Sequence, residues 1–159
     1  MSMFKVNVVV VNPKREELAT APMETLVDTD SELTWLPAAA LQQIGILPRR
    51  DRTFATATKQ IVKRQVGYAI LRAEGYETTD EVVFAEPGDM TLLGVRTLEG
   101  FGVVVDNIGH RFVAQTTIVA VLCDIPSEVL MSPPSPEEIA RRAEEAKARA
   151  QAILTKQTR

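Results

Sequence analysis

Short runs of β-branched residues recur along residues 1–125 of this chain, and Gly, Pro or Asp bounds most of them. β-Branched side chains fit the pleated, half-buried surface of a strand, whereas Gly, Pro and Asp favour the turns between strands. The pattern predicts strands at residues 4–11, 24–27, 61–71, 81–84, 102–105 and 116–123. We therefore expect the body of the chain to be mainly β.

One short helix is predicted inside this body. Pro37 suits the first helical position, residues 38–42 have high helix propensity, and Gly45 suits the C-terminal end. A second helix is predicted beyond a Pro-rich linker at residues 126–134, because Ser135 can cap a helix that runs over residues 135–159. The composition thus predicts a body at residues 1–125, the linker and a C-terminal helix.

The charge and hydropathy of the chain bound its partners. With 18 Lys and Arg against 21 Asp and Glu, the net charge is −3, so we expect no nucleic acid as a partner. The longest apolar stretches fall far short of the roughly 20 residues that cross a bilayer, so no membrane partner is expected. Cys123 is the only cysteine, and residues 1–12 lack a basic leader and a cleavage site. These features predict a cytoplasmic location.

Several kinds of catalytic site are disfavoured. His110 is the only histidine, no Gly-x-Ser-x-Gly segment exists, and Cys123 lies within an apolar strand pattern, so a Ser or Cys triad is not expected. No group of His, Cys or close carboxylates has the spacing of metal ligands, so we expect no metal and no cofactor.

The segment Leu-Val-Asp-Thr-Asp-Ser at residues 26–31 is the strongest candidate site. It places the carboxyl group of Asp28 where an apolar strand runs into a turn. From the residues alone, Asp28 is either a turn-capping residue that bonds nearby backbone or a reactive acid.

Its wider context resembles the retropepsin-like aspartic peptidases, the single-lobe relatives of retroviral protease. The Asp-Thr pair follows an apolar strand, Leu-Thr-Trp-Leu-Pro and the short helix come next, and Thr-Leu-Leu-Gly-Val follows at residues 91–95. The resemblance covers residues 4–113 and implies a closed β-barrel lobe with one short helix. It also implies that Asp28 is the catalytic aspartate, and that the Thr29 hydroxyl braces the two active-site loops of a dimer. Leu92, Leu93 and Gly94 would form the segment that supports the active-site loop.

The resemblance also implies a flap, a β-hairpin that closes over the substrate, at residues 54–67. The residues near its tip would be Ala57, Thr58, Lys59 and Gln60. Basic residues of this region, Lys59, Lys63 and Arg64, either favour acidic peptides or simply form an exposed strand face. Because one chain supplies one catalytic aspartate, the implied enzyme is a homodimer that cleaves peptides or proteins. The strands at residues 4–11 and 116–123 would pair at the dimer interface.

Asp30 departs from the family pattern, which has glycine at this position. The substitution adds a side chain and a negative charge to the active-site floor, where two aspartates must share one proton. We therefore keep an alternative function, a catalytically silent dimer of the same fold that binds peptides or other partners.

Two other enzyme classes share the local Asp-x-Asp pattern: the haloacid-dehalogenase-like phosphatases and the sugar-nucleotide transferases. The phosphatases require alternating strands and helices around a parallel sheet, whereas this body has one predicted helix among its strands. The transferases have larger folds. Both classes are disfavoured.

Overall fold

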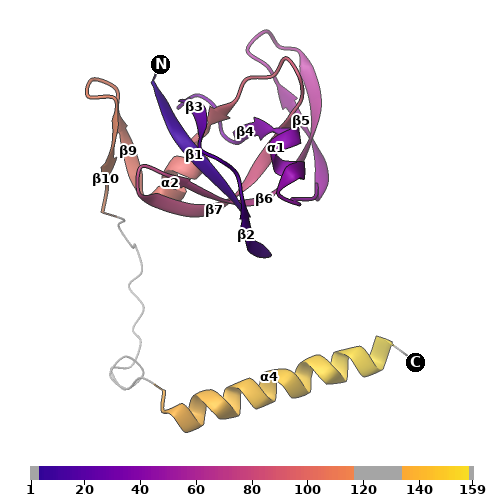
Figure 1. Ribbon diagram of the computed structural model, residues 1–159. Helices are drawn as coiled ribbons and strands as arrows, with labels where there is room; N and C mark the ends of the chain where they lie inside the picture. The colour runs from indigo at the N-terminus through magenta and orange to yellow at the C-terminus, as the bar shows by residue number, and fades with distance from the viewer. Residues whose placement is uncertain (1–3, 117–133, 158–159) are drawn as a thin grey trace. The chain divides into compact units, whose positions relative to one another are not determined.

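The computed structural model describes residues 4–116 and 134–157 (Figure 1). Contacts within the chain divide it into a body, Met1–Ile118, and a C-terminal unit, Val119–Arg159. The predicted end of the body at residue 125 falls outside the described residues, as does the predicted linker up to residue 133.

The body holds ten described strands and two short helices. The strands are β1 Lys5–Asn12, β2 Arg15–Ala19, β3 Met23–Val27, β4 Thr34–Pro37, β5 Arg50–Ala55, β6 Ile61–Ala73, β7 Tyr76–Ala85, β8 Leu92–Leu93, β9 Val103–Asp106 and β10 Arg111–Ala114. The helices are α1 Ala38–Gln43 and α2 Val95–Phe101, and α4 Pro136–Gln157 belongs to the C-terminal unit. The prediction of a mainly β body followed by a C-terminal helix is confirmed.

Eight of the strands form one mixed sheet in the order β2-β1-β3-β8-β4-β7-β6-β5, and β9 and β10 form a separate antiparallel pair. Two of the pairings in the large sheet are parallel, β3 with β8 and β4 with β7. The segment that contains Asp28 lies between β3 and β4 along the chain, since β3 ends immediately before this residue and β4 begins at Thr34.

The expected closed barrel needs correction, because the structure has one large mixed sheet with two free ends. β1 pairs with β3 through its first half and with β6 through its second half, which folds the sheet over on itself. The strands at the two ends of the order, β2 and β5, do not pair with each other among the described residues. The link between β4 and β8 is the single residue pair Trp35 and Leu92.

The predicted role of residues 4–11 as a strand of the dimer interface is not tested by contacts within one chain and stays a prediction. Within its own chain, β1 pairs with β2, β3 and β6, and its side chains Val8, Val10 and Val11 are fully buried. It therefore contributes to the core of the body. Of the other predicted interface strand, residues 117–123 lie outside the described residues, and Thr116 is not in a strand.

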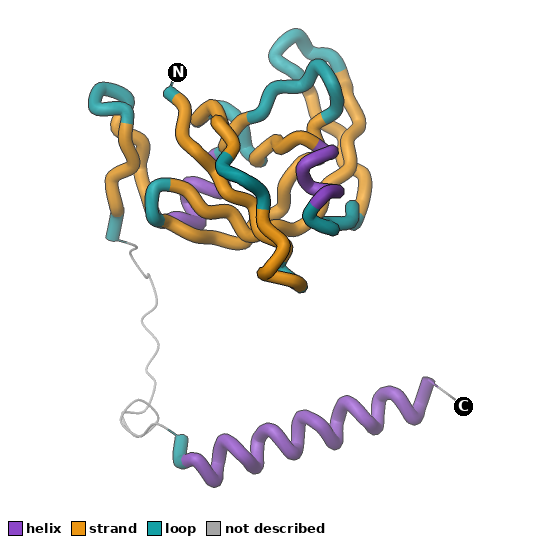
Figure 2. The backbone as a smooth tube through the Cα atoms, viewed as in Figure 1, coloured by secondary structure: helices purple, strands orange, loops and turns teal. Residues whose placement is uncertain are grey.

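The core lies between the folded halves of the sheet and the two body helices (Figure 2). Fully buried side chains from β1, β3, β4, β6, β7, β8 and α1 meet there; they include Val8, Val27, Leu36, Leu41, Leu71, Val82 and Leu93. α1 packs against β4 and β7, and α2 packs against β7 and β9. This second body helix was not predicted from the sequence. The apolar residues on both sides of Asp28 thus anchor its loop to the main core.

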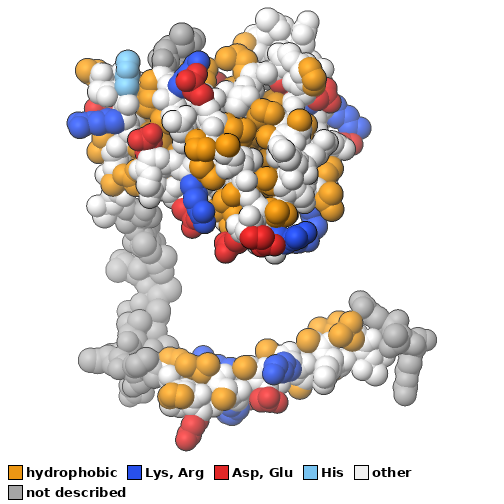
Figure 3. All heavy atoms as spheres, viewed as in Figure 1, with side chains coloured by type: hydrophobic (Ala, Val, Ile, Leu, Met, Phe, Trp, Pro, Cys, Tyr) orange, Lys and Arg blue, Asp and Glu red, His pale blue; other side chains and the backbone are white. Residues whose placement is uncertain are grey.

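The helix α4 begins as predicted. The Ser135 hydroxyl accepts a hydrogen bond from the Glu138 N–H at 3.2 Å, which is an N-terminal cap. Arg142 forms an ion pair with Glu138 one turn earlier, at 2.6 Å. Apolar, acidic and basic side chains are interspersed along the helix (Figure 3). Across the described residues, the helices are all too short or too polar to span a membrane.

Candidate active site

The loop that contains Asp28 is positioned by the parallel pairing of β3 with β8. This pairing continues beyond β3, because the Asp28 N–H donates to the Leu93 carbonyl at 3.0 Å. The half-buried Asp28 side chain accepts a hydrogen bond from the Asp30 N–H at 2.9 Å, which closes a local turn. The main chain on both sides of the carboxylate is therefore held in place. The turn-capping contact and a reactive role are compatible, since a carboxylate has two oxygens.

Gly94 follows β8 and lies against the far side of the same loop. A Cβ atom at this position would lie 2.5 Å from the carbonyl carbon and oxygen of Leu33. Only glycine allows this approach, although its φ of −90° is accessible to any residue. The first N–H groups of α2 then bond to the loop, from Val95 to the Ser31 carbonyl at 2.8 Å and from Arg96 to the Glu32 carbonyl at 3.1 Å. The start of α2 is therefore joined to the candidate loop by main-chain contacts.

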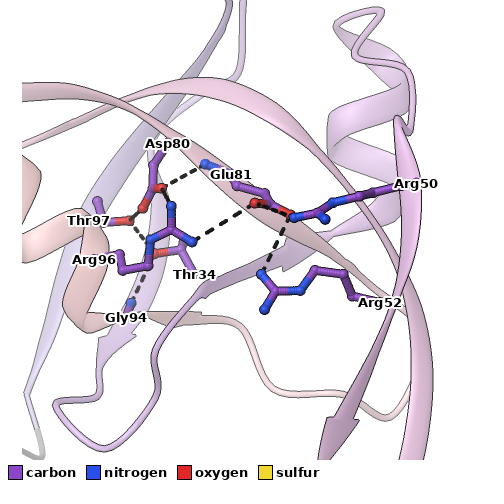
Figure 4. A network of polar contacts seen from close by, with 8 residues as sticks. All are labelled: Thr34, Arg50, Arg52, Asp80, Glu81, Gly94, Arg96 and Thr97. Atoms are coloured by element: carbon purple, nitrogen blue, oxygen red, sulfur yellow. Dashed lines mark hydrogen bonds and ion pairs between the residues drawn. The ribbon is translucent and has the colours of Figure 1, made fainter.

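A buried chain of hydroxyl groups extends from this junction (Figure 4). The Gly94 N–H donates to the Thr34 hydroxyl at 2.9 Å, and the Thr97 hydroxyl donates to the Asp80 carboxylate at 3.0 Å. The two hydroxyls are 2.6 Å apart and both residues are fully buried. Because the Thr97 proton is directed to Asp80, the Thr34 hydroxyl donates to Thr97. Each of the two hydroxyl groups thus has hydrogen-bond partners, and the direction of each hydrogen bond is defined.

Asp80 adjoins Glu81, whose side chain is only 9% exposed and lies among three arginines (Figure 4). Arg50 donates from Nη2 to both carboxylate oxygens of Glu81, at 2.9 and 3.1 Å. Arg52 lies 3.6 Å away and Arg96 lies 3.9 Å away, each as an ion pair. Since Arg50 and Arg52 belong to β5, this cluster joins the base of the β5–β6 hairpin to α2 and β7.

The β5–β6 hairpin occupies the region predicted for the flap. Its strands pair from Arg50 with Val66 to Ala55 with Ile61. At its tip the Thr56 N–H donates to the Gln60 carbonyl at 2.8 Å, and Lys59 has a positive φ of 60°. The predicted tip residues Ala57, Thr58, Lys59 and Gln60 are all exposed in this turn.

A cleft of about 760 Å³ separates the Asp28 loop from this hairpin. Its lining comprises Asp28, Asp30, Ser31, Glu32, Leu33, Trp35, Arg52, Thr53, Phe54, Ala55, Thr56, Ala57, Val62, Asp89, Met90 and Leu92. The structure thus brings together four of the predicted site residues, which are Asp28, Asp30, Ala57 and Leu92. The others do not line the cleft; they are Thr29, Thr58, Lys59, Gln60, Leu93 and Gly94. Of these, Leu93 and Gly94 are buried beneath the loop.

One wall of the cleft is apolar and aromatic. The rings of Trp35 and Phe54 meet edge to face, with their centroids 5.1 Å apart. Both pack against a small buried cluster of Leu33, Val66 and Val83. Trp35 therefore packs beside the Asp28 loop and also presents part of its surface to the cleft. The register of β5 that brings Phe54 to this place was not apparent from the sequence.

Asp89 and Arg64 form a fork at the edge of the cleft. Arg64 donates from Nε and Nη2 to the two Asp89 oxygens at 2.7 and 3.0 Å, and both side chains are less than one-fifth exposed. The hydrogen bonds from Arg64, aided by the Glu86 N–H, hold the pKa of Asp89 below its ordinary value, although burial opposes this. Arg64 is thus engaged within its own chain, as is Lys63, whose ammonium lies 3.3 Å from Asp51.

This fork predicts a specific pH dependence of stability. Because the folded-state pKa of Asp89 is depressed, its contribution is present above the unfolded-state pKa and is lost as pH falls through the folded-state value. We expect Asp89→Asn to lower the free energy of unfolding by on the order of 1 kcal/mol at pH 6. The difference from wild type should shrink below about pH 4. Urea unfolding at several pH values measures it, with Asp51→Asn as an exposed control, and a difference that is independent of pH would contradict the assignment.

Comparison with known proteins gives limited matches. No protein-family model and no curated protein matches the chain. It is similar to two solved structures of a foamy viral protease-reverse transcriptase. One is in complex with double-stranded DNA, with 15% identity, a TM-score of 0.40, and coverage of 77% of this chain and 18% of the other. The second is in complex with an RNA/DNA hybrid, with 14% identity, a TM-score of 0.44, and coverage of 92% and 17%. This chain spans less than one-fifth of either protein.

The prediction that excluded nucleic acid as a partner is wrong. Both of these similar structures are complexes with nucleic acid. The prediction relied on the net charge of −3, which averages over the whole chain, whereas nucleic acid is held by local groups of Arg and Lys. The matched complexes are of much longer proteins and show nothing about what this chain binds.

Proposed function

We propose that this protein is a retropepsin-like aspartic endopeptidase that acts as a homodimer. The observation that supports this most is the cleft that the half-buried residue Asp28 lines together with residues of the β5–β6 hairpin. An extended peptide could occupy such a cleft, with apolar side chains against Trp35 and Phe54. The resemblance of residues 26–31 and 91–95 to the family's two motifs gives Asp28 its role.

The chemistry requires a second aspartate, which Asp28 of the partner subunit would supply. One carboxylate takes a proton from water, and the water oxygen attacks the carbonyl carbon of the scissile bond. The other, protonated carboxyl group gives its proton to the carbonyl oxygen, which yields a diol. When the C–N bond breaks, the leaving nitrogen receives a proton from the dyad and a diol hydroxyl returns one. The products are a carboxylic acid and an amine, and the dyad again holds one proton.

Asp30 is the residue that distinguishes between the proposed enzyme and the alternative function, a catalytically silent dimer. It is exposed, lines the cleft and has a negative φ, so this turn requires no glycine. Its charge near Asp28 should hinder the sharing of one proton by the dyad. We expect Asp30→Gly to raise kcat/KM for peptide cleavage by about tenfold. Unchanged or lower activity in this variant would contradict the proposed restraint.

The deciding experiment is cleavage of a mixed peptide library between about pH 3.5 and 7. Wild type, Asp30→Gly and Asp28→Asn are compared at concentrations where sedimentation shows a dimer. Cleavage by wild type that Asp28→Asn lacks supports the peptidase. Cleavage by Asp30→Gly alone identifies a silenced peptidase. A folded dimer of which no form cleaves any peptide would overturn the enzyme and leave the binding function.

A further inference from the structure

The polar cluster at the base of the hairpin contains more positive than negative groups. Its cationic members are Arg50, Arg52 and Arg96, and its carboxylates are Asp80 and Glu81. Asp80 is already engaged, because it accepts from the Thr97 hydroxyl and from the Glu81 N–H. Three guanidinium groups and two carboxylates leave one positive charge without an equivalent partner.

Arg52 and Arg96 carry this surplus charge, since both lie beyond hydrogen-bond distance of the carboxylates, and of these two only Arg52 lines the cleft. Arg50 occupies both oxygens of Glu81 with hydrogen bonds, whereas Arg52 approaches one of them at 3.6 Å, beyond hydrogen-bond distance. Among the described residues, we find no hydrogen bond donated by the Arg52 guanidinium. Its central carbon lies 5.5 Å from the centroid of the Phe54 ring, which supports the group on one side.

Arg52 also faces the cleft. Its side chain is 29% exposed, and it is the one cationic side chain among the described residues that line this cavity. The carboxylates that line the cleft are Asp28, Asp30, Glu32 and Asp89. None of them forms an ion pair with Arg52 in the described part of the chain. The planar group is thus held in place yet retains donors for another carboxylate.

We propose that Arg52 forms a carboxylate-binding subsite, so that the cleft selects peptides with a carboxylate beside the apolar residue that Trp35 and Phe54 contact. This inference rests on the proposed function and names its substrate class. Lys59, Lys63 and Arg64, the basic residues that the sequence analysis considered for acidic peptides, do not line the cleft. The carboxylate is either an Asp or Glu side chain or the C-terminus of the peptide, and the two sources can be separated.

The test measures binding of fluorescent peptides to the full-length chain carrying Asp28→Asn, so that it does not depend on cleavage. Peptides that differ by Glu against Gln are compared, each with a free and an amidated C-terminus. We expect the carboxylate to tighten binding by about tenfold. Adding Arg52→Gln should bring this ratio close to one, and Arg52→Lys should retain part of it. Lys63→Gln, on the same hairpin but outside the cleft, should leave the ratio unchanged.

The outcomes separate this inference from the proposed function. If the carboxylate tightened peptide binding by the same ratio with Arg52 and with Arg52→Gln, the subsite would be overturned. Cleavage of peptides by wild type would still support the peptidase. A preference retained only by peptides with a free C-terminus would assign the subsite to the terminal carboxylate. Failure of every peptide both to bind and to be cleaved would overturn both proposals.

Discussion

Replacing Asp28 by Asn is expected to lower kcat/KM for peptide cleavage by about 10³-fold or more. In a homodimer the single substitution changes both members of the dyad, so neither a base for the water nor an acid for the carbonyl remains. The shape of the loop should survive, because Asn retains an oxygen that can accept the hydrogen bond from the Asp30 N–H. Kinetics with a peptide that wild type cleaves, together with sedimentation to verify the dimer, measure the effect.

Asp106→Asn is the matched control. Asp106 is the last residue of an apolar strand, β9, and its Oδ1 accepts hydrogen bonds from the N–H groups of Ile108 and Gly109. It does not line the cleft, so its replacement should leave cleavage unchanged. Residual activity of Asp28→Asn within tenfold of wild type would exclude Asp28 as the catalytic acid or base.

The second large effect is expected from Gly94→Ala. The added methyl group would meet the main chain of Leu33 at 2.5 Å, and neither segment can move without disturbing the contacts of α2 with the Asp28 loop. We expect a loss of about 3 kcal/mol in the free energy of unfolding, and reduced cleavage by the fraction that remains folded. Urea unfolding followed by circular dichroism gives the first quantity.

Gly75→Ala provides the comparison for Gly94→Ala. Gly75 has a φ of +82° but no atom within 4 Å of a Cβ position, so its replacement changes backbone conformation without a steric clash. Its cost should be about 1–2 kcal/mol. If Gly94→Ala were as stable as Gly75→Ala or more so, the close approach of the loop to the supporting segment would not hold the site together.

The local signals in the sequence located much of the fold. The Ala-rich run ending before Gly45 became α1, and Ser135 caps α4. The segment after β3 became the loop at the cleft, because strand ends and turns depend mainly on neighbouring residues. The helix α2 was missed because it has seven residues and includes Gly100, which reads as a break.

The chemistry of the cleft walls was less accessible to sequence reasoning. Arg52 reaches Glu81 across β6, which lies between β5 and β7 in the sheet, so their contact depends on tertiary register. The engagement of Arg64 by Asp89 likewise joins residues 25 positions apart. Charge patterns along the chain identified basic residues on the hairpin but did not reveal which of them were already neutralised.

The candidate loop is joined to its neighbouring elements through its main chain. The Asp28 N–H and the carbonyls of Ser31 and Glu32 make its contacts with β8 and α2, whereas the side chains of Asp30 and Glu32 are exposed. Substitutions of these exposed side chains should therefore have little effect on the stability of the fold and act chiefly on the properties of the cleft. Under the proposed function, substitutions at these positions, Asp30 among them, can change the charge of the cleft while the scaffold persists.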